Sequence, residues 1–129
     1  MKYYKCQHCG NLVRTIEDGG VVPMCCGEPM TLLPYSEFND AHWITYKVDE
    51  SPIDFKRIMI CIGKNSYHPM SIEHYIVFID LETSKGIHTY FLRPGNVPCV
   101  QFFIRKNETI LTIYTYCNVH GLYKLDMDE

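Results

Sequence analysis

The sequence has no long apolar run, no excess of basic residues and no sustained helical periodicity. None of its apolar stretches reaches the roughly 18 residues that a membrane-spanning helix needs, so we expect no membrane partner. Its 12 basic and 15 acidic residues give a net charge of −3, which argues against nucleic acid as a partner. The N-terminus lacks a signal-peptide pattern, and this favours a cytoplasmic location.

The chain also lacks the even cysteine count of a fully disulfide-bonded protein, because it has seven cysteines among 129 residues. Thiols in the cytoplasm are usually reduced, so metal ligation is the better interpretation of these cysteines. Cys61 and Cys99 lie in apolar, strand-like stretches. We interpret these two as buried free thiols that behave as small apolar side chains.

Two groups of cysteines near the N-terminus have the spacing of a metal site. The stretch from Cys6 to Gly10 is a Cys-x-x-Cys-Gly knuckle, and Cys25 to Gly27 places two adjacent cysteines before a glycine. The glycines permit positive backbone angles, and Asp18 to Gly20 predicts a hairpin turn between the two groups. Four thiolates in so short a segment predict a tetrahedral iron or zinc site that also staples the fold. The predicted ligands are Cys6, Cys9, Cys25 and Cys26.

From His42 onward the sequence consists of short segments rich in Ile, Val, Tyr, Phe and Thr, separated by turn residues. This pattern predicts a mainly β chain in which an antiparallel sandwich follows the metal-stapled module. Pro34 interrupts regular structure between the two, so we predict a module over residues 1–33, a linker over 34–41 and a sandwich over 42–129. The expected strands are Ile53–Ile62, Ile72–Leu81, Ile87–Leu92, Cys99–Ile104 and Thr109–Tyr116.

A second set of candidate ligands lies at the expected strand ends and loops of the sandwich. Cys117 and His120 follow the last expected strand, His68 and His74 lie around an earlier strand start, and His42 opens the domain. Taken alone, the Cys117/His120 pair is weak evidence for a metal site, and a buried thiol beside a surface histidine is then the better interpretation. Gathered together, four imidazoles and one thiolate would leave one octahedral position open. This donor set favours a redox iron over a structural zinc.

The order and spacing of these motifs resemble the desulfoferrodoxins, the two-iron class of superoxide reductases, over essentially the whole chain. The resemblance implies a desulforedoxin-like module with a rubredoxin-like iron, followed by a neelaredoxin-like catalytic module with an immunoglobulin-like antiparallel β-sandwich. The matching segments are Cys6–Gly10, Cys25–Met30, His68–Met70, Glu73–Tyr75, Leu92–Gly95 and Cys117–Leu122.

By this resemblance the chain is an oxidoreductase that reduces superoxide to hydrogen peroxide by one electron, a detoxification reaction under oxidative stress. It implies two irons per chain, with zinc as the other candidate in the four-cysteine site. Superoxide, an electron donor such as rubredoxin and a second copy of the chain in a homodimer are the implied partners. The implied ligands of the catalytic iron are His42, His68, His74 and His120 around it and Cys117 on its axis.

One departure from the family lies immediately before its first ligand histidine. The family usually has Glu-Lys there, whereas this chain has Asp40 and Ala41 before His42. Asp40 is a candidate for a weak cap on the iron, but Ala41 cannot replace the ammonium group that attracts superoxide. Lys47 or Lys64 would have to supply that charge from elsewhere.

The departure leaves two alternatives open. His88 is the reserve candidate if His42 is not a ligand. The second function is a non-catalytic protein, either an iron electron carrier or a metal-stabilised module that has lost turnover with the Glu-Lys pair.

Overall fold

The computed structural model describes residues 1–127. The chain divides into two compact units, one over residues 1–34 and one that begins at residue 35. Both units are built from strands, and the one helix among the described residues is a single 3-10 turn, η1, over Asp40–His42. No helix in this part of the chain is long and apolar enough to cross a membrane. The expectation of a mainly β chain is confirmed.

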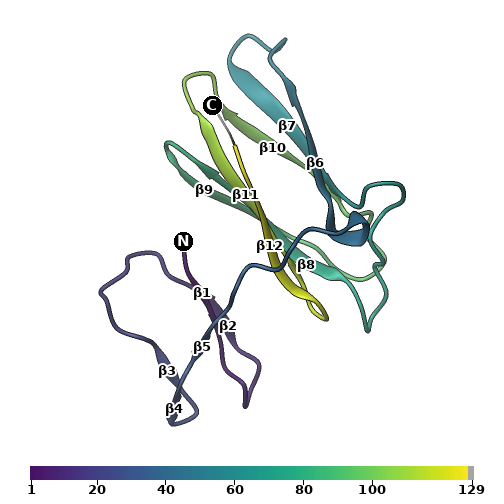
Figure 1. Cartoon of the computed structure of the whole chain (residues 1–129). Helices are drawn as coiled ribbons and strands as arrows, with labels where there is room; N and C mark the ends of the chain where they lie inside the picture. Colours follow the sequence, from purple (N-terminus) through teal and green to yellow (C-terminus); the bar gives the residue numbers. More distant parts are fainter. Residues whose placement is uncertain (128–129) are drawn as a thin grey trace. The chain divides into compact units, whose positions relative to one another are not determined.

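The first unit consists of two very small antiparallel sheets (Figure 1). Three strands pair in the order β2-β1-β5, and two more form a separate hairpin, β3-β4. Its small buried cluster contains Tyr4, Cys6 and Met30, with Cys25 packed against them, and Tyr3 is buried as well. The strands are β1 (Tyr3–Lys5), β2 (Leu12–Arg14), β3 (Met24–Cys25), β4 (Glu28–Pro29) and β5 (Thr31–Leu32).

The predicted hairpin turn at Asp18 to Gly20 is wrong. This segment lies in the loop between β2 and β3, which do not pair with each other. The Asp18 carboxylate accepts the backbone N–H of Gly20 at 2.8 Å and pairs with Lys2, also at 2.8 Å. An Asx turn of this kind satisfies the backbone locally without needing flanking strands. The real hairpins, β1-β2 and β3-β4, instead turn at the cysteine knuckles.

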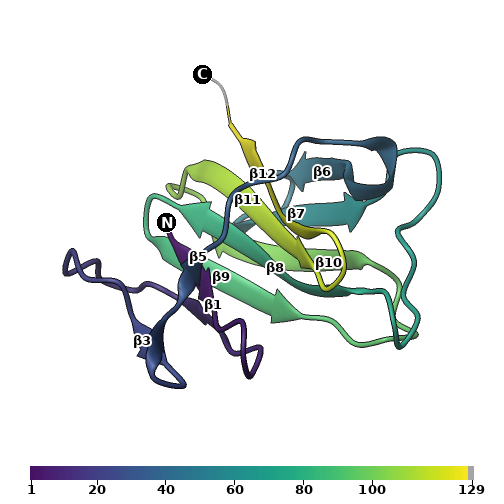
Figure 2. The same cartoon turned by 60° about the horizontal axis from the view of Figure 1, so that its bottom comes forward.

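The second unit is a sandwich of two antiparallel sheets, which Figures 1 and 2 show as separate layers. One sheet has the order β10-β7-β6 and the other the order β12-β11-β8-β9. The strands are β6 (Ile44–Asp49), β7 (Phe55–Ile62), β8 (Ile76–Thr83), β9 (Gly86–Phe91), β10 (Cys99–Arg105), β11 (Ile110–Cys117) and β12 (Gly121–Asp126).

Alternation along the strands builds the core between these layers. In β7, Ile58, Ile60 and Ile62 are fully buried, whereas the residues between them are partly exposed. Ile79 of β8 and Ile113 of β11 are fully buried in the same cluster. Each such side chain contributes about 1.5–3 kcal/mol by leaving water. This core fixes the strand ends from which the functional loops extend.

Two strands, β6 and β12, were not expected from the sequence, and β8 begins at Ile76 rather than at Ile72. The residues before β8 form a turn in which the N–H groups of Ser71 and His74 each donate to the other residue's carbonyl, at 3.0 and 3.3 Å. His74 therefore lies in a loop and not at the start of a strand. Gly121, with φ of +93°, begins β12 directly after the turn that follows β11.

Cys61 and Cys99 are joined by a disulfide, which contradicts their interpretation as buried free thiols. They occupy directly opposite positions on β7 and β10, and both are only half-buried. The inward positions of β7 belong to isoleucines, so Cys61 falls on the outer face of its sheet. The remaining five cysteines are free.

Candidate metal centres

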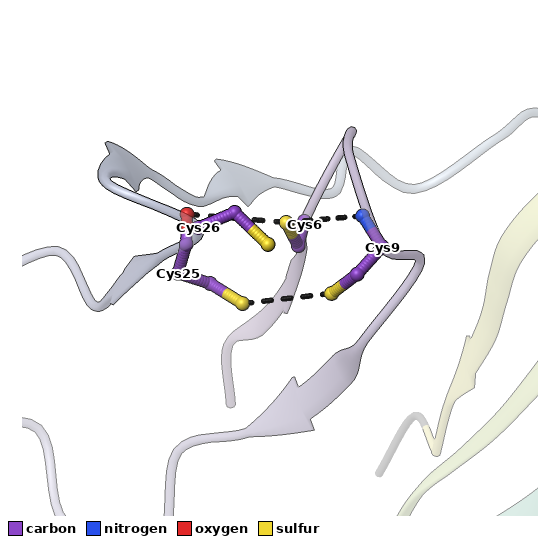
Figure 3. A group of neighbouring side chains, drawn as sticks. All are labelled: Cys6, Cys9, Cys25 and Cys26. Atoms are coloured by element: carbon purple, nitrogen blue, oxygen red, sulfur yellow. Dashed lines mark hydrogen bonds between the residues drawn. The ribbon is translucent and has the colours of Figure 1, made fainter.

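The four N-terminal cysteines converge on one point. Their sulfur atoms all lie within 4.8 Å of one another, and Figure 3 shows them directed into the same space. The Sγ atoms of Cys9 and Cys25 are 3.6 Å apart. Cys6 is buried, whereas Cys9 and Cys26 are exposed, so the cluster lies at the surface of its unit.

Left-handed backbone at the two knuckles explains this convergence. Gly10 has φ of +82° and Gly27 has φ of +77°, which confirms the role expected for these glycines. Cys26 itself has φ of +53°, a conformation that is uncommon for a residue with a Cβ atom. The Gly10 N–H donates to the Cys6 carbonyl at 2.9 Å, and the Cys9 N–H is 3.5 Å from the Cys6 sulfur.

The charges of these thiols fit a bound cation. The backbone N–H of Cys9 lowers the pKa of Cys6 to about 6, so this thiol ionises readily. Hydrogen bonding to Cys6, Cys9 and Cys25 raises the pKa of Cys26 to about 12, because further thiolates would repel one another. A positive ion among the sulfurs removes that repulsion and holds all of them as thiolates. The donor set is the tetrahedral four-sulfur type that iron and zinc occupy.

The second group comes from widely separated parts of the sandwich sequence. His42 ends η1, His68 follows β7, His74 precedes β8, and Cys117 is the last residue of β11. One ligand atom from each lies within 4.8 Å of the others. His120, in the turn after β11, adds its Nδ1 atom 3.7 Å from the Cys117 sulfur.

The four imidazoles form a closed ring of neighbours. The ring centroids of His42 and His68 are 4.8 Å apart, and those of His68 and His74 are 4.7 Å apart. The ring closes through His120, whose centroid is 4.9 Å from that of His74 and 5.0 Å from that of His42. Cys117 is fully buried and His120 is exposed. Four nitrogen donors in a ring beside one buried sulfur is the arrangement of a five-ligand metal site.

Hydrogen bonds to Nδ1 determine which ring nitrogen is free in two of the imidazoles. Nδ1 of His42 is 2.8 Å from the Asn39 side-chain oxygen, and Nδ1 of His68 is 2.7 Å from the Pro69 carbonyl. Both rings therefore turn Nε2 towards the cluster, where these two atoms are 3.2 Å apart. Within residues 1–127, Nε2 of His74 is the buried side-chain nitrogen that has no hydrogen-bond partner. A buried unpaired donor or acceptor is costly, and a metal ion would satisfy it.

Two of the imidazoles, those of His42 and His68, are held in the neutral form that binds metals. Burial, together with the neighbouring His68, lowers the pKa of His42 to about 4. Burial also lowers the pKa of His68. Tyr123 of β12 stacks on the His42 ring, with centroids 4.2 Å apart and an interplanar angle of 7°. Tyr123 therefore shields the site on this side, and His42 and His68 have free lone pairs at neutral pH.

Other candidates from the sequence lie outside this group. His88 is on β9 and bonds to the Glu108 carboxylate at 2.8 Å. Asp40 is exposed in η1, and its carbonyl accepts the backbone N–H of Lys64 at 2.9 Å. The Lys64 ammonium lies 4.7 Å from the Trp43 ring centroid, beside the segment that carries His42. Figures 1 and 2 show η1 next to the loop that follows β7.

Sequence reasoning did not identify Asn39 and Tyr123, which orient and cover His42. Asn39 caps η1, since its side-chain oxygen also accepts the backbone N–H of His42 at 3.0 Å. An asparagine three residues before a ligand is a weak signal, although Asn is a preferred N-cap residue. Nothing in the sequence pairs Tyr123 with His42, because their contact depends on how β12 returns along β11.

A four-cysteine module together with a sandwich that carries a four-histidine, one-cysteine cluster defines a two-centre metalloprotein. The desulfoferrodoxin N-terminal domain model matches residues 1–33, and the desulfoferrodoxin model matches residues 37–126. The desulfoferrodoxin of Nitratidesulfovibrio vulgaris is 32% identical over 123 residues, which cover 95% of this chain and 94% of that protein. The chain belongs to the desulfoferrodoxin family.

Solved structures share the fold. The superoxide reductase from Treponema pallidum aligns with a TM-score of 0.77 at 23% identity, covering 97% of this chain and 96% of that one. The superoxide reductase (1Fe-SOR) from Giardia intestinalis aligns with a TM-score of 0.54 at 25% identity, covering 70% of this chain and 100% of that one.

Proposed function

We propose that this protein is a superoxide reductase, which adds one electron and two protons to superoxide and releases hydrogen peroxide. The observation that carries the proposal is the ring of four histidines beside the buried Cys117. Membership of the desulfoferrodoxin family and the likeness to proteins named superoxide reductases also support it.

The proposed ligands of the catalytic iron are His42, His68, His74 and His120 with Cys117. Bound ferrous iron would supply the electron. Cys117 would contribute negative charge to the metal, as axial thiolates do in haem sites. Its sulfur accepts the backbone N–H of His120 at 3.5 Å. These five residues would hold the iron and would leave it able to take one further small ligand.

Neutral imidazoles keep the site more positive than carboxylates would, which suits an anionic substrate. We propose that Lys64 adds the positive charge that Ala41 does not provide. Its backbone is bonded to Asp40, and its ammonium lies over Trp43, the residue after His42. Lys47, by comparison, lies on β6 opposite Met59 of β7, on the sheet face away from the isoleucine core. Asp40 remains a proposed weak cap on the iron.

For the N-terminal module we propose a second iron held by Cys6, Cys9, Cys25 and Cys26, or a zinc that serves only the fold. In the iron form the module would relay electrons from a donor such as rubredoxin. We further propose a cytoplasmic homodimer. The proposed functional division is the module over residues 1–33, a linker over 34–41 and the catalytic sandwich over 42–129.

The test is the stoichiometry of the reaction. A known amount of superoxide is added to reduced, iron-loaded protein, and hydrogen peroxide and dioxygen are both measured. A reductase gives one peroxide for each superoxide and no dioxygen. His74→Ala should lose this activity, whereas His88→Ala, which removes a histidine outside the ring, should keep it. Dioxygen release at half the superoxide consumed would mean dismutation and would contradict the proposal.

The second candidate function is electron transfer without turnover, and the replacement of the usual lysine by Ala41 favours it. Under this alternative the protein would be reduced and reoxidised reversibly by a small redox protein. Superoxide would then disappear at its spontaneous rate whether the protein is present or not.

A further inference from the structure

The pair Cys61 and Cys99 belongs to neither metal centre. These two cysteines are disulfide-bonded to each other, whereas the other five are free and lie in the two metal clusters. They are directly opposite in the register of β7 and β10, which pair over seven residues. The strand ladder alone therefore holds the two sulfur positions together.

Both sulfurs belong to the solvent face of their sheet. Ile60 and Ile62, on either side of Cys61, are fully buried, and Val100, next to Cys99, is buried on the same inner face. Successive side chains of a strand point to opposite faces, so the two cysteines point outward. Each is partly exposed, and the neighbouring Thr45 of β6 is exposed as well. Small solutes can therefore reach the Cys61–Cys99 disulfide, whereas they could not reach a disulfide buried in the core.

The disulfide lies one residue from the loop that positions the histidine ring. The Ile62 N–H donates to the Pro98 carbonyl at 3.0 Å, and the Ile62 carbonyl accepts the His68 N–H at 3.0 Å. Gly63 then donates its N–H to the Trp43 carbonyl at 2.8 Å. This glycine has φ of +115°, and a Cβ atom there would meet the Ser66 carbonyl oxygen at 2.0 Å. The pair thus adjoins the tightly built loop beside the site that would produce peroxide.

We propose that Cys61 and Cys99 form a redox-active pair, which hydrogen peroxide closes to the disulfide and a dithiol reductant reopens. In closure, one thiol loses its proton and the resulting thiolate attacks peroxide. The O–O bond breaks, a sulfenic acid forms, and the leaving hydroxide takes up that proton as water. The second thiol then attacks the sulfenic sulfur, the S–S bond forms, and a second water leaves. Two thiols are oxidised and one peroxide is reduced. Reopening is thiol–disulfide exchange, in which the reductant becomes the disulfide.

This proposal rests on the proposed function only for the local source of peroxide, so its test uses added peroxide. The full metal-loaded chain is treated under native, anaerobic conditions with dithiothreitol, which is then removed. It next receives one equivalent of hydrogen peroxide. Samples from each stage are alkylated, digested and analysed by mass spectrometry. The peptides that carry Cys61 and Cys99 should be unlabelled at first, labelled after reduction and unlabelled again after peroxide.

Single variants test the order of bond formation. Cys61→Ser and Cys99→Ser each leave one thiol without its partner. After peroxide, dimedone should label at least one of these variants as a sulfenic acid, and wild type should show much less label because its second thiol closes the disulfide. The peptides with Cys6 and Cys117 in the same digest give the background from the metal-ligand thiols.

Two results would overturn the proposal. One is a Cys61–Cys99 bond that dithiothreitol opens only after the protein is unfolded, as a structural cross-link would behave. The other is a reduced pair that stays fully labelled after peroxide. Neither result depends on superoxide. A pair that cycles in a protein without superoxide turnover would support this proposal and contradict only the proposed function.

Discussion

The two metal clusters are built in opposite ways. The cysteine module has a small buried cluster of Tyr4, Cys6 and Met30, and one of these is itself a predicted ligand. The histidine ring instead lies at the ends of strands that enclose a large core of isoleucine, valine, phenylalanine and leucine. One ligand, Cys6, is therefore part of a very small buried cluster in the module, whereas the sandwich has a large aliphatic core in which Cys117 is one member among many.

The two units therefore depend on a bound metal in different ways. A unit with so little buried apolar surface cannot offset its conformational entropy, so metal binding and folding are coupled in the module. In the sandwich the fold comes first and places the donors, with Asn39 and Pro69 orienting two of the rings. Loss of metal should then affect the two units very differently.

The largest expected effect follows from removing a module ligand. Cys25→Ser should abolish metal binding at the four-cysteine site and unfold residues 1–34, because structural metals in small domains contribute about 10–16 kcal/mol of apparent binding free energy. Amide chemical-shift dispersion, measured by NMR for each unit, checks this. Cys117→Ser is the matched control, and both units should stay folded in it. A module that keeps its dispersion without metal would contradict the comparison.

The second effect concerns an ion network that stabilises the sandwich independently of metal. Burial raises the pKa of Glu108, but hydrogen bonds from Thr83, His88 and the Arg105 N–H outweigh burial and lower it to about 2. A lowered carboxyl pKa stabilises the fold above the ordinary value of 4.5, and this contribution is lost as pH falls towards 2. The shift corresponds to about 3 kcal/mol.

Glu108→Gln should therefore lower the unfolding free energy at neutral pH by about 3 kcal/mol and flatten its dependence on pH in this acid range. Urea unfolding of the sandwich at several pH values measures both. Glu50→Gln, at an exposed position, is the control and should change little. Equal acid sensitivity in wild type and Glu108→Gln would show that the network does not carry this stability.

The smallest effect concerns charge near the histidine ring. Lys64→Ala should reduce the bimolecular rate with superoxide about tenfold at low salt and less at high salt, because steering of an anion by a fixed charge is screened by ions. Lys47→Ala is the matched control and should have little effect. Ala41→Lys should raise the rate at low salt. The rates of all three variants are measured by pulsed generation of superoxide with optical detection. Identical rates for Lys64→Ala and Lys47→Ala would show that Lys64 does not attract superoxide to the site.

The sequence was most informative where a motif is local. The Cys-x-x-Cys-Gly spacing and the adjacent cysteines predicted the four sulfurs that the structure brings together, because each knuckle is set by a few backbone angles. The histidines were found as candidates from their places near strand ends. Their ring could not be deduced from spacing, since it depends on how loops from both sheets meet.

The failures share a physical cause, which is dependence on register between distant strands. Cys61 and Cys99 looked like core thiols because both lie in apolar stretches. Only the pairing of β7 with β10 shows that they are opposite each other on the outer face. The alternation of Cys61 with the apolar Ile60 and Ile62 was a sequence signal that Cys61 points to the outer face. In the same way, Glu108 meets His88 of β9 only because the loop from β10 to β11 crosses between the two sheets.

Iron per chain shows whether the cysteine cluster and the histidine ring each hold one iron. Wild type, Cys117→Ser and Cys25→Ser are purified without oxidant, and iron is quantified beside the folded state of each unit. The account predicts two irons in wild type and about one in Cys117→Ser with both units folded. In Cys25→Ser it predicts about one iron, with only the sandwich folded. Iron content that is unchanged by Cys117→Ser would mean that the histidine ring holds no metal through this sulfur, and would contradict the account.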